Sequence, residues 1–206
     1  MGDESITDRY LTLAGPCDGL FKAKGSKHFG YVYPIASESD VELHLAELRR
    51  VHHAARHHCY AWRLGPLGER YRSNDDGEPN NSAGPPILGA LRSRELTGCL
   101  AVVVRYFGGT KLGVGGLIEA YREATLDALN QGEVVERFVE RTFRISFPYA
   151  RMGDVMSHLK KWDVSPSATD FDISCTLEAS IRLRDADSFS NGLEDVDVRV
   201  QALRTK

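Results

Sequence analysis

The segment GCLAVVVRYF (98–107) is the most apolar run in the chain, and it constrains the fold more than any other feature. A valine-rich run without polar alternation is typical of a strand that is buried on both faces. Such a strand lies inside a sheet and needs packed layers above and below it. The sequence therefore predicts a sheet with this segment as its central strand.

Five glycines follow this strand and precede a predicted helix: Gly108, Gly109, Gly113, Gly115 and Gly116. A glycine-rich turn between a buried strand and a helix presents backbone N–H groups and a helix N-terminus to an anion. The spacing matches neither common nucleotide motif, because Val114 and Gly115 stand where a Walker A loop has Lys and Ser or Thr, and Ile118 takes the last position of a G-x-G-x-x-G. Two interpretations stay open: a phosphate or nucleic-acid backbone site, or a loop pressed against neighbouring backbone, where glycine avoids Cβ clashes.

The first 135 residues read as an α/β two-layer domain. The pattern predicts strands over 10–15, 27–35, 58–65 and 70–73, and helices over 39–55, in the second half of 74–93, and over 117–130. Ser39 and Glu42 have the spacing of a capping box for the first helix, Ser82 is placed to cap the second, and Gly132 ends the third.

The remainder, 138–206, has a different pattern, and we place the domain boundary near residues 134–138. A strand over 136–150 is followed by a helix over 151–162, one or two strands over 168–184, a helix over 185–196 and a strand over 198–203. The order β-α-β-β-α-β predicts a ferredoxin-like domain. The fold class is therefore α+β, with an N-terminal domain at 1–135 and a C-terminal domain at 138–206.

Composition argues against several classes of protein. A net charge of −3 argues against a chain that coats nucleic acid nonspecifically, although a local basic patch is compatible with it. The four cysteines are scattered without a C-x-x-C pair, no leader peptide is recognisable, and no apolar run reaches the ~20 residues of a membrane span. We expect a reduced, cytoplasmic protein that does not bind membranes.

The turn SNDDGEP (73–79) contains three acidic residues of the kinds that occur in metal sites and in catalytic sites. Asp75, Asp76 and Glu78 have the oxygen ligands of a hard cation and the groups of an acid–base pair. The spacing is not that of an EF-hand, and acids around an Asp-Gly turn more often bond nearby backbone N–H groups. We expect a capped turn, with one acid paired to Arg105 or Lys111 across a cleft, and no metal.

Four histidines and a cysteine crowd into 52–59. His53 and His57 have the i, i+4 spacing of zinc ligands, but they span the predicted passage from helix to strand, where that geometry breaks. His57 and His58 are better interpreted as partly buried, hydrogen-bonded residues at a strand start. Ser82 and Cys59 lack the surroundings of any nucleophile motif, so neither a catalytic residue nor a cofactor is predicted.

Four segments together resemble the IMPACT family: KAKGSKHFGYVYPI (22–35), ARHHCYAW (55–62), NDDGEPNNSAGPPIL (74–88) and VVVRYFGGTKLGVGGLIEAY (102–121). The resemblance covers the whole chain, including the smaller C-terminal domain of bacterial members. It departs from the family pattern at Asn74 and at Asn81–Ser82, where Ser and Gly-Thr are usual. The resemblance implies an N-terminal domain similar to a small-subunit ribosomal protein, domain IV of elongation factor G and small-molecule kinases, and a C-terminal domain similar to domain V of that factor.

The leading hypothesis is a non-catalytic regulator of translation that binds RNA, the ribosome or a translation-factor partner. Its cleft would be formed by Asp75, Asp76, Glu78, Arg105, Gly108, Gly109, Lys111, Gly113, Gly115 and Gly116. His57, His58, Lys22, Lys24 and Lys27 would support it. The alternative is an enzyme acting on a phosphorylated small molecule or a peptide, with Asp76 or Glu78 as acid or base. A third hypothesis gives both motifs a structural role and places a protein partner on the C-terminal sheet.

Overall fold

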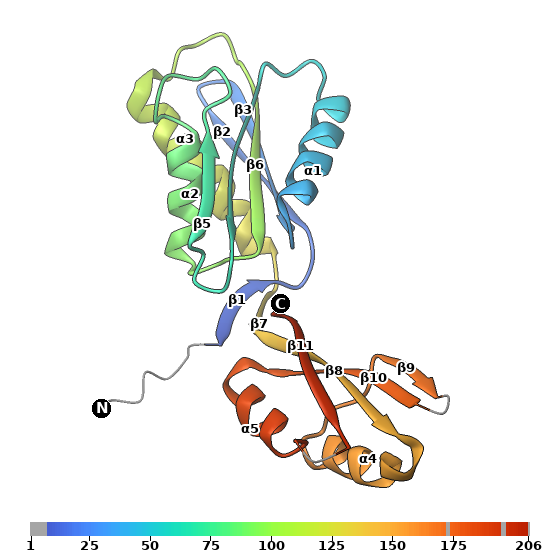
Figure 1. Ribbon diagram of the computed structural model, residues 1–206. Helices are drawn as coiled ribbons and strands as arrows, with labels where there is room; N and C mark the ends of the chain where they lie inside the picture. Colours follow the sequence, from blue (N-terminus) through green and yellow to red (C-terminus); the bar gives the residue numbers. More distant parts are fainter. Residues whose placement is uncertain (1–7, 172–173, 195–196, 206) are drawn as a thin grey trace, which may run out of the picture. The chain divides into compact units, whose positions relative to one another are not determined.

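A computed structural model of the chain describes residues 8–171, 174–194 and 197–205. These residues form two compact units (Figure 1). One unit is Tyr10–Arg137, and the other contains the described residues of Phe138–Lys206 together with Asp8 and Arg9. No helix in these ranges is long and apolar enough to cross a membrane.

The first unit is built on a five-stranded sheet in the order β2-β3-β6-β4-β5. Its strands are β2 (Cys17–Ala23), β3 (Ser26–Pro34), β4 (His57–Leu64), β5 (Arg70–Asn74) and β6 (Cys99–Tyr106). Every neighbouring pair is antiparallel. The predicted central strand is confirmed, because β6 lies in the middle of the sheet and is buried from Cys99 to Arg105. A separate two-stranded sheet pairs β1 (Arg9–Leu13) with β7 (Val134–Phe138).

The edge strand β2 is not among the predicted strands. Its sequence, CDGLFKA, contains Asp18 and Gly19, two residue types that are uncommon in strands. The reason for the glycine lies in the packing of the sheet. Gly19 is opposite Gly30 of β3, so the two glycines form a flat patch on the sheet.

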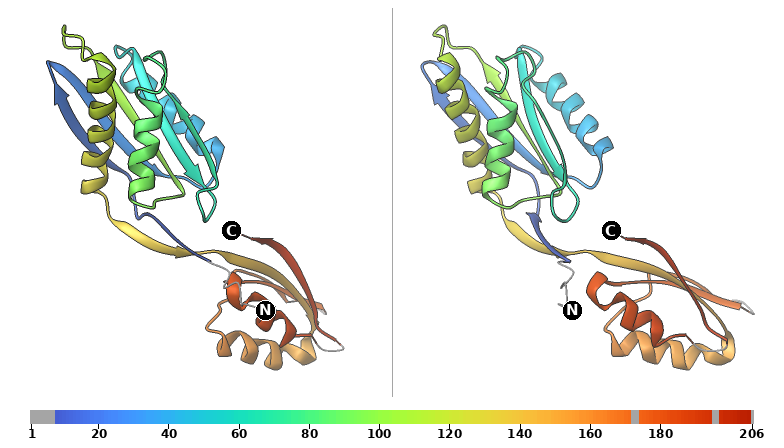
Figure 2. Two further views of the ribbon diagram at one scale, coloured as in Figure 1. Left: turned by 90° about the vertical axis from the view of Figure 1, so that its left-hand side faces the viewer. Right: turned by 60° about the vertical axis from the view of Figure 1, so that its left-hand side comes forward.

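Helices cover both faces of this sheet (Figure 2). α2 (Gly84–Ser93) and α3 (Gly113–Gln131) lie on one face, and α1 (Glu38–Val51) lies on the other. A Cβ on Gly30 would come within 2.3 Å of the Ala124 carbonyl oxygen of α3, and one on Gly19 would come within 2.4 Å of the Ala128 nitrogen. The glycine patch therefore lets α3 approach the sheet more closely than side chains would allow.

The helix starts differ from the predicted ones. The capping box of α1 is formed by Ser37 and Asp40, not by Ser39 and Glu42. Both pairs have the same spacing, but the Asp40 carboxylate accepts hydrogen bonds from the backbone of Ala36 and Ser37 and so selects the earlier start. α3 begins at Gly113 rather than near residue 117, which places three of the five glycines in its first turn.

The predicted cap of α2 by Ser82 is also wrong. The Ser82 hydroxyl donates to the Pro79 carbonyl, and Ala83 occupies the capping position without a side-chain bond of its own. The backbone N–H groups of Ala83 and Gly84 donate instead to the Asp75 carboxylate, at 2.9 and 2.8 Å. An acid eight residues upstream in the turn therefore stabilises the positive end of the helix.

The second unit follows the predicted order of elements. They are β8 (Glu140–Pro148), a 3-10 turn at Tyr149–Arg151, α4 (Met152–Lys161), β9 (Ala168–Phe171), β10 (Ser174–Arg182), a 3-10 turn at Leu183–Asp185, α5 (Ala186–Asn191) and β11 (Arg199–Thr205). The strands form an antiparallel sheet in the order β11-β8-β10-β9, and their inward side chains pack with those of both helices. The last two residues of the predicted helix 185–196 and residues 172–173 of the predicted strands lie outside the described residues.

Replacing Gly30 with alanine should destabilise the protein by about 1–3 kcal/mol, because the added methyl group meets the backbone of α3 and cannot be relieved by a rotamer change. Urea unfolding measures this loss. Gly89→Ala is the matched control: Gly89 lies within α2 with nothing within 4 Å of an added Cβ, so this change should be neutral or stabilise by up to about 1 kcal/mol. Equal stability of the two variants would contradict the close approach of α3.

Candidate functional site

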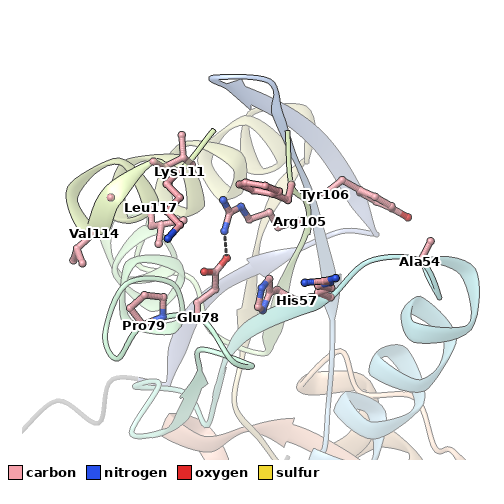
Figure 3. A pocket seen from close by; sticks show the side chains of 13 residues that line it. Ala54, His57, Glu78, Pro79, Arg105, Tyr106, Lys111, Val114 and Leu117 are labelled. Carbon is pink, nitrogen blue, oxygen red and sulfur yellow. Dashed lines mark hydrogen bonds and ion pairs between the residues drawn. The ribbon is translucent and has the colours of Figure 1, made fainter. Parts of the chain in front are cut away.

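Antiparallel pairing brings the starts of β3 and β4 beside the ends of β5 and β6. His57 lies opposite Arg105, and Lys27 lies opposite Tyr106. A cavity of about 860 Å³, which we call the main cavity, opens at this end of the sheet (Figure 3). It is lined by Ala54, Arg56, His57, Glu78, Pro79, Arg105, Tyr106, Phe107, Lys111, Leu112, Gly113, Val114 and Leu117.

A buried polar network forms the floor of the main cavity. The Glu78 carboxylate accepts a hydrogen bond of 2.6 Å from the Arg105 guanidinium and one of 2.7 Å from the Tyr121 hydroxyl. All three residues are buried, and they come from the acidic turn, from β6 and from α3. The predicted pairing of one acid of the turn with Arg105 is therefore present, and it ties three elements together.

Burial sets the protonation of the groups around this network. The ring of His28 packs edge-on against Tyr121, with 5.3 Å between the ring centroids. Loss of hydration lowers the pKa of His28 to about 4, and the positive charge of Arg105 acts in the same direction. Burial likewise raises the pKa of the Tyr121 hydroxyl, which keeps it a hydrogen-bond donor. His28 is thus neutral at physiological pH.

The other two acids of the turn are held by the protein itself. One Asp75 oxygen accepts the two α2 amides described above, and the second accepts from the Asn81 N–H at 2.9 Å. Asp76 accepts from the His58 N–H at 2.7 Å and is 3.6 Å from the Arg49 guanidinium. Asn81 has a φ of +64°, and asparagine tolerates this left-handed conformation. Neither aspartate lines the main cavity.

The histidine cluster is split by the start of β4. His57 lines the main cavity, and its Nδ1 donates to the Asp76 carbonyl at 2.9 Å, which leaves Nε2 as the free nitrogen of the ring. His58 is buried on the other face, and the Cys59 thiol donates to the Asp75 carbonyl. In the described ranges of the chain, no group of three or more His, Cys, Asp or Glu side chains is arranged to hold a metal ion.

The glycine-rich segment has two different functions in the fold. Gly108 is pressed against the β2–β3 hairpin, because a Cβ there would come within 1.9 Å of the Gly25 carbonyl carbon. Gly113 opens α3 with a φ of +75° and has nothing within 4 Å of an added Cβ. No side chain caps this helix start, and its first turn contains no acid. The close-packing interpretation therefore holds for Gly108, and the anion site stays a hypothesis that rests on the helix start at Gly113.

The charge around the main cavity is mostly positive. Arg56, Lys111 and Arg105 line it together with a single carboxylate, Glu78. Glu78 is neutralised by Arg105, and among the described residues no acid pairs with Arg56 or Lys111. The N-terminus of a helix of 19 residues adds a partial positive charge at the same place.

The structure thus gathers only part of the predicted site. Glu78, Arg105, Lys111, Gly113 and His57 line the main cavity. The remaining candidates do not line it: Asp75, Asp76, His58, Gly108, Gly109, Gly115, Gly116, Lys22, Lys24 and Lys27. Arg56 was missed, although its place immediately before His57 puts it at the same end of β4; its charge next to the histidines was the available signal.

Replacing one partner of the buried Glu78–Arg105 pair should destabilise the protein far more than replacing both. We expect Arg105→Met or Glu78→Leu alone to destabilise the protein by about 3–5 kcal/mol, because each leaves an unpaired buried charge. The double variant should lose much less than the sum, as measured by urea unfolding in a double-mutant cycle. Arg70→Met, which breaks the exposed pair with Glu38, should cost at most about 1 kcal/mol. Additive losses at Arg105 and Glu78 would show that they do not interact.

The low pKa of His28 predicts a loss of stability in acid. The unfolded chain takes up a proton near pH 6.5, whereas the folded protein does so only near pH 4. The contribution of His28 is therefore fully present above pH 6.5 and falls by about 3 kcal/mol as the pH drops to 4. His28→Phe should remove this part of the pH dependence of the unfolding free energy. Parallel pH profiles for the two proteins would contradict a neutral, buried His28.

Comparison with known proteins agrees with this architecture. The family described as the Impact N-terminal domain matches residues 24–129. The IMPACT family member YvyE of Bacillus subtilis is 30% identical over 187 residues, 91% of this chain and 86% of that protein. YigZ of Escherichia coli is 28% identical over 195 residues, 94% of this chain and 87% of that protein.

A crystal structure of a hypothetical protein superposes with a TM-score of 0.74 at 26% identity, covering 97% of this chain and 99% of that one. The family match spans β3 to α3 and so contains every residue that lines the main cavity. The chain is a member of the IMPACT family.

Proposed function

We propose that the main cavity binds the phosphate backbone of RNA, and that the protein is a non-catalytic factor acting on translation. The observation that carries this proposal is the uncapped N-terminus of α3, which faces a cavity whose unpaired charges, Arg56 and Lys111, are both positive. Phosphate oxygens accept hydrogen bonds from such amides and pair with both side chains.

Arg105 provides a second, independent argument for an anion. Its side chain is 8% exposed, and its Nε has no hydrogen-bond acceptor among the described residues. A buried guanidinium N–H without an acceptor costs free energy. Because Nε is itself closed to solvent, a phosphate oxygen in the main cavity would supply the missing acceptor only after a local shift of the cavity wall.

The alternative, an enzyme with Asp76 or Glu78 as acid or base, gains no support from the contacts. Asp76 is bonded to the backbone of His58 and paired with Arg49, while Glu78 is bonded to Arg105 and Tyr121. Both carboxylates are thus already engaged by groups of the protein, and Asp76 does not line the main cavity. We therefore assign both acids to holding the cavity rather than to chemistry.

The resemblance to elongation factor G supports a partner in translation only by analogy. We take the second unit to be a ferredoxin-like domain, on its β-α-β-β-α-β order and its strand order β11-β8-β10-β9. In this proposal the two units correspond to domains IV and V of that factor, and RNA or the ribosome is the partner.

Replacing Lys111 or Arg56 with glutamine should weaken binding to a labelled single-stranded RNA. Each lost phosphate contact should lower the salt dependence of log K by about 0.7. Fluorescence anisotropy across a salt series measures both effects, and sedimentation with ribosomes extends the comparison. These two residues are exposed, so the test avoids the structural damage expected at Arg105.

Lys160→Gln removes the same charge from an exposed position on α4 and serves as the control. It should leave affinity and salt dependence unchanged. If the wild-type protein binds neither RNA nor ribosomes at low salt, or if all three variants behave alike, the proposal is wrong.

A further inference from the structure

A second hollow of about 320 Å³ adjoins the main cavity. It is lined by Gly25, Lys27, Phe29, His52, Tyr106 and Phe107. Tyr106 and Phe107 line both hollows, so the two meet at the end of β6. The second hollow lies on the side of the sheet that carries α1, since Phe29 and Tyr106 pack against the core on that side. Four of its six residues have ring side chains.

The ring walls of this hollow are held in place by hydrogen bonds. His52, at the end of α1, contacts the Tyr31 hydroxyl through Nε2 at 2.8 Å and the Tyr106 hydroxyl through Nδ1 at 2.9 Å. Phe29 packs edge-on against Tyr106, with 5.8 Å between the ring centroids. The walls are therefore arranged before any ligand enters, which reduces the entropy that binding costs.

Phe107 stands between the two hollows with 60% of its surface exposed. The Arg105 guanidinium carbon lies over its ring, 5.7 Å from the ring centroid. The next residue, Gly108, donates its N–H to the Ser26 hydroxyl at 3.1 Å and is packed against the backbone of Gly25. The backbone beside Phe107 is thus held in place, and the apolar ring is exposed at the mouth of a positively charged cavity.

We propose that the second hollow is a base slot: it takes one unstacked nucleobase of a single-stranded RNA whose phosphate lies in the main cavity. This inference rests on the proposed function and names the form of RNA that the site selects. Aromatic side chains stack on any base, because every base has a π-face. The exposed cation Lys27 lines the slot, where it can meet a neighbouring phosphate.

The slot discriminates between single strands and duplexes. The bases of an A-form duplex are paired and stacked inside the helix, so none can enter a hollow beside the backbone site. A duplex would reach Arg56 and Lys111 but not the rings of the slot. The cations around the rings favour a polyanion over an uncharged apolar peptide segment as the occupant.

Phe107→Ala should weaken binding of a single-stranded RNA about tenfold, as expected for loss of one base–aromatic stack, and should leave binding of the matching duplex unchanged. A single strand carrying 2-aminopurine reports the stack directly: its fluorescence should be quenched on binding to the wild-type protein and not to the variant. Tyr149→Ala removes an aromatic side chain that is 69% exposed in the second unit, and should change neither measurement.

The outcomes separate the slot from the phosphate site. If single strands bind with dependence on Lys111, but without quenching and without loss in Phe107→Ala, the slot is wrong and the phosphate site stands. Equal loss of single strands and duplexes in Phe107→Ala also overturns the slot. If the wild-type protein binds no RNA, both the proposed function and the base slot are wrong.

Discussion

The buried contact of Arg105 and Tyr121 with the Glu78 carboxylate is the interaction on which the site depends. It joins the end of the central strand to the acidic turn and to the middle of α3. Without it, three segments that are remote in the sequence would have no polar reason to meet, and each charge would be buried without a partner. Because Glu78 and Arg105 neutralise each other, Arg56 and Lys111 are, within the described residues, the unpaired charges that the main cavity offers to a ligand.

Close packing of backbone segments at glycines also positions the elements of the site. Gly19 and Gly30 let α3 lie against the sheet, and this brings Tyr121 within reach of Glu78. At the end of the sheet where the main cavity opens, Gly25 and Gly108 pack backbone against backbone and hold the chain beside Phe107. Glycine acts in these places by having no side chain, whereas Gly113 acts by adopting a left-handed conformation.

Long, regular patterns could be predicted from the sequence, and contacts between remote residues could not. The apolar run of β6 follows from residue type alone. Residue type also predicts that one acid of the turn pairs with Arg105 or Lys111, but it does not tell which acid or which cation. The strand β2 was missed because its glycine serves α3 rather than its own strand, and tertiary packing outweighs local propensity. Asp75 is among the residues predicted to form the cleft because nothing local shows that its carboxylate caps α2 across eight residues.

The choice between two equivalent capping boxes shows the same limit. Ser37–Asp40 and Ser39–Glu42 have identical spacing, and only the backbone of Ala36 and Ser37 decides between them. The second hollow was missed for a related reason. Its rings come from β3, from the end of α1 and from the end of β6, and only pairing of these strands brings them together.

The neutralisation of the acidic turn separates the protein's local charge from its overall charge. In the proposed complex, a net charge of −3 would repel RNA at a distance, whereas RNA would meet the positive side chains of Arg56 and Lys111 at the main cavity. Salt screens the distant repulsion over a length of about 8 Å at physiological ionic strength. The proposal therefore implies opposite effects of salt on the two rates: added ions would raise the rate of association, by screening the repulsion, and would raise the rate of dissociation, by weakening the contacts in the main cavity.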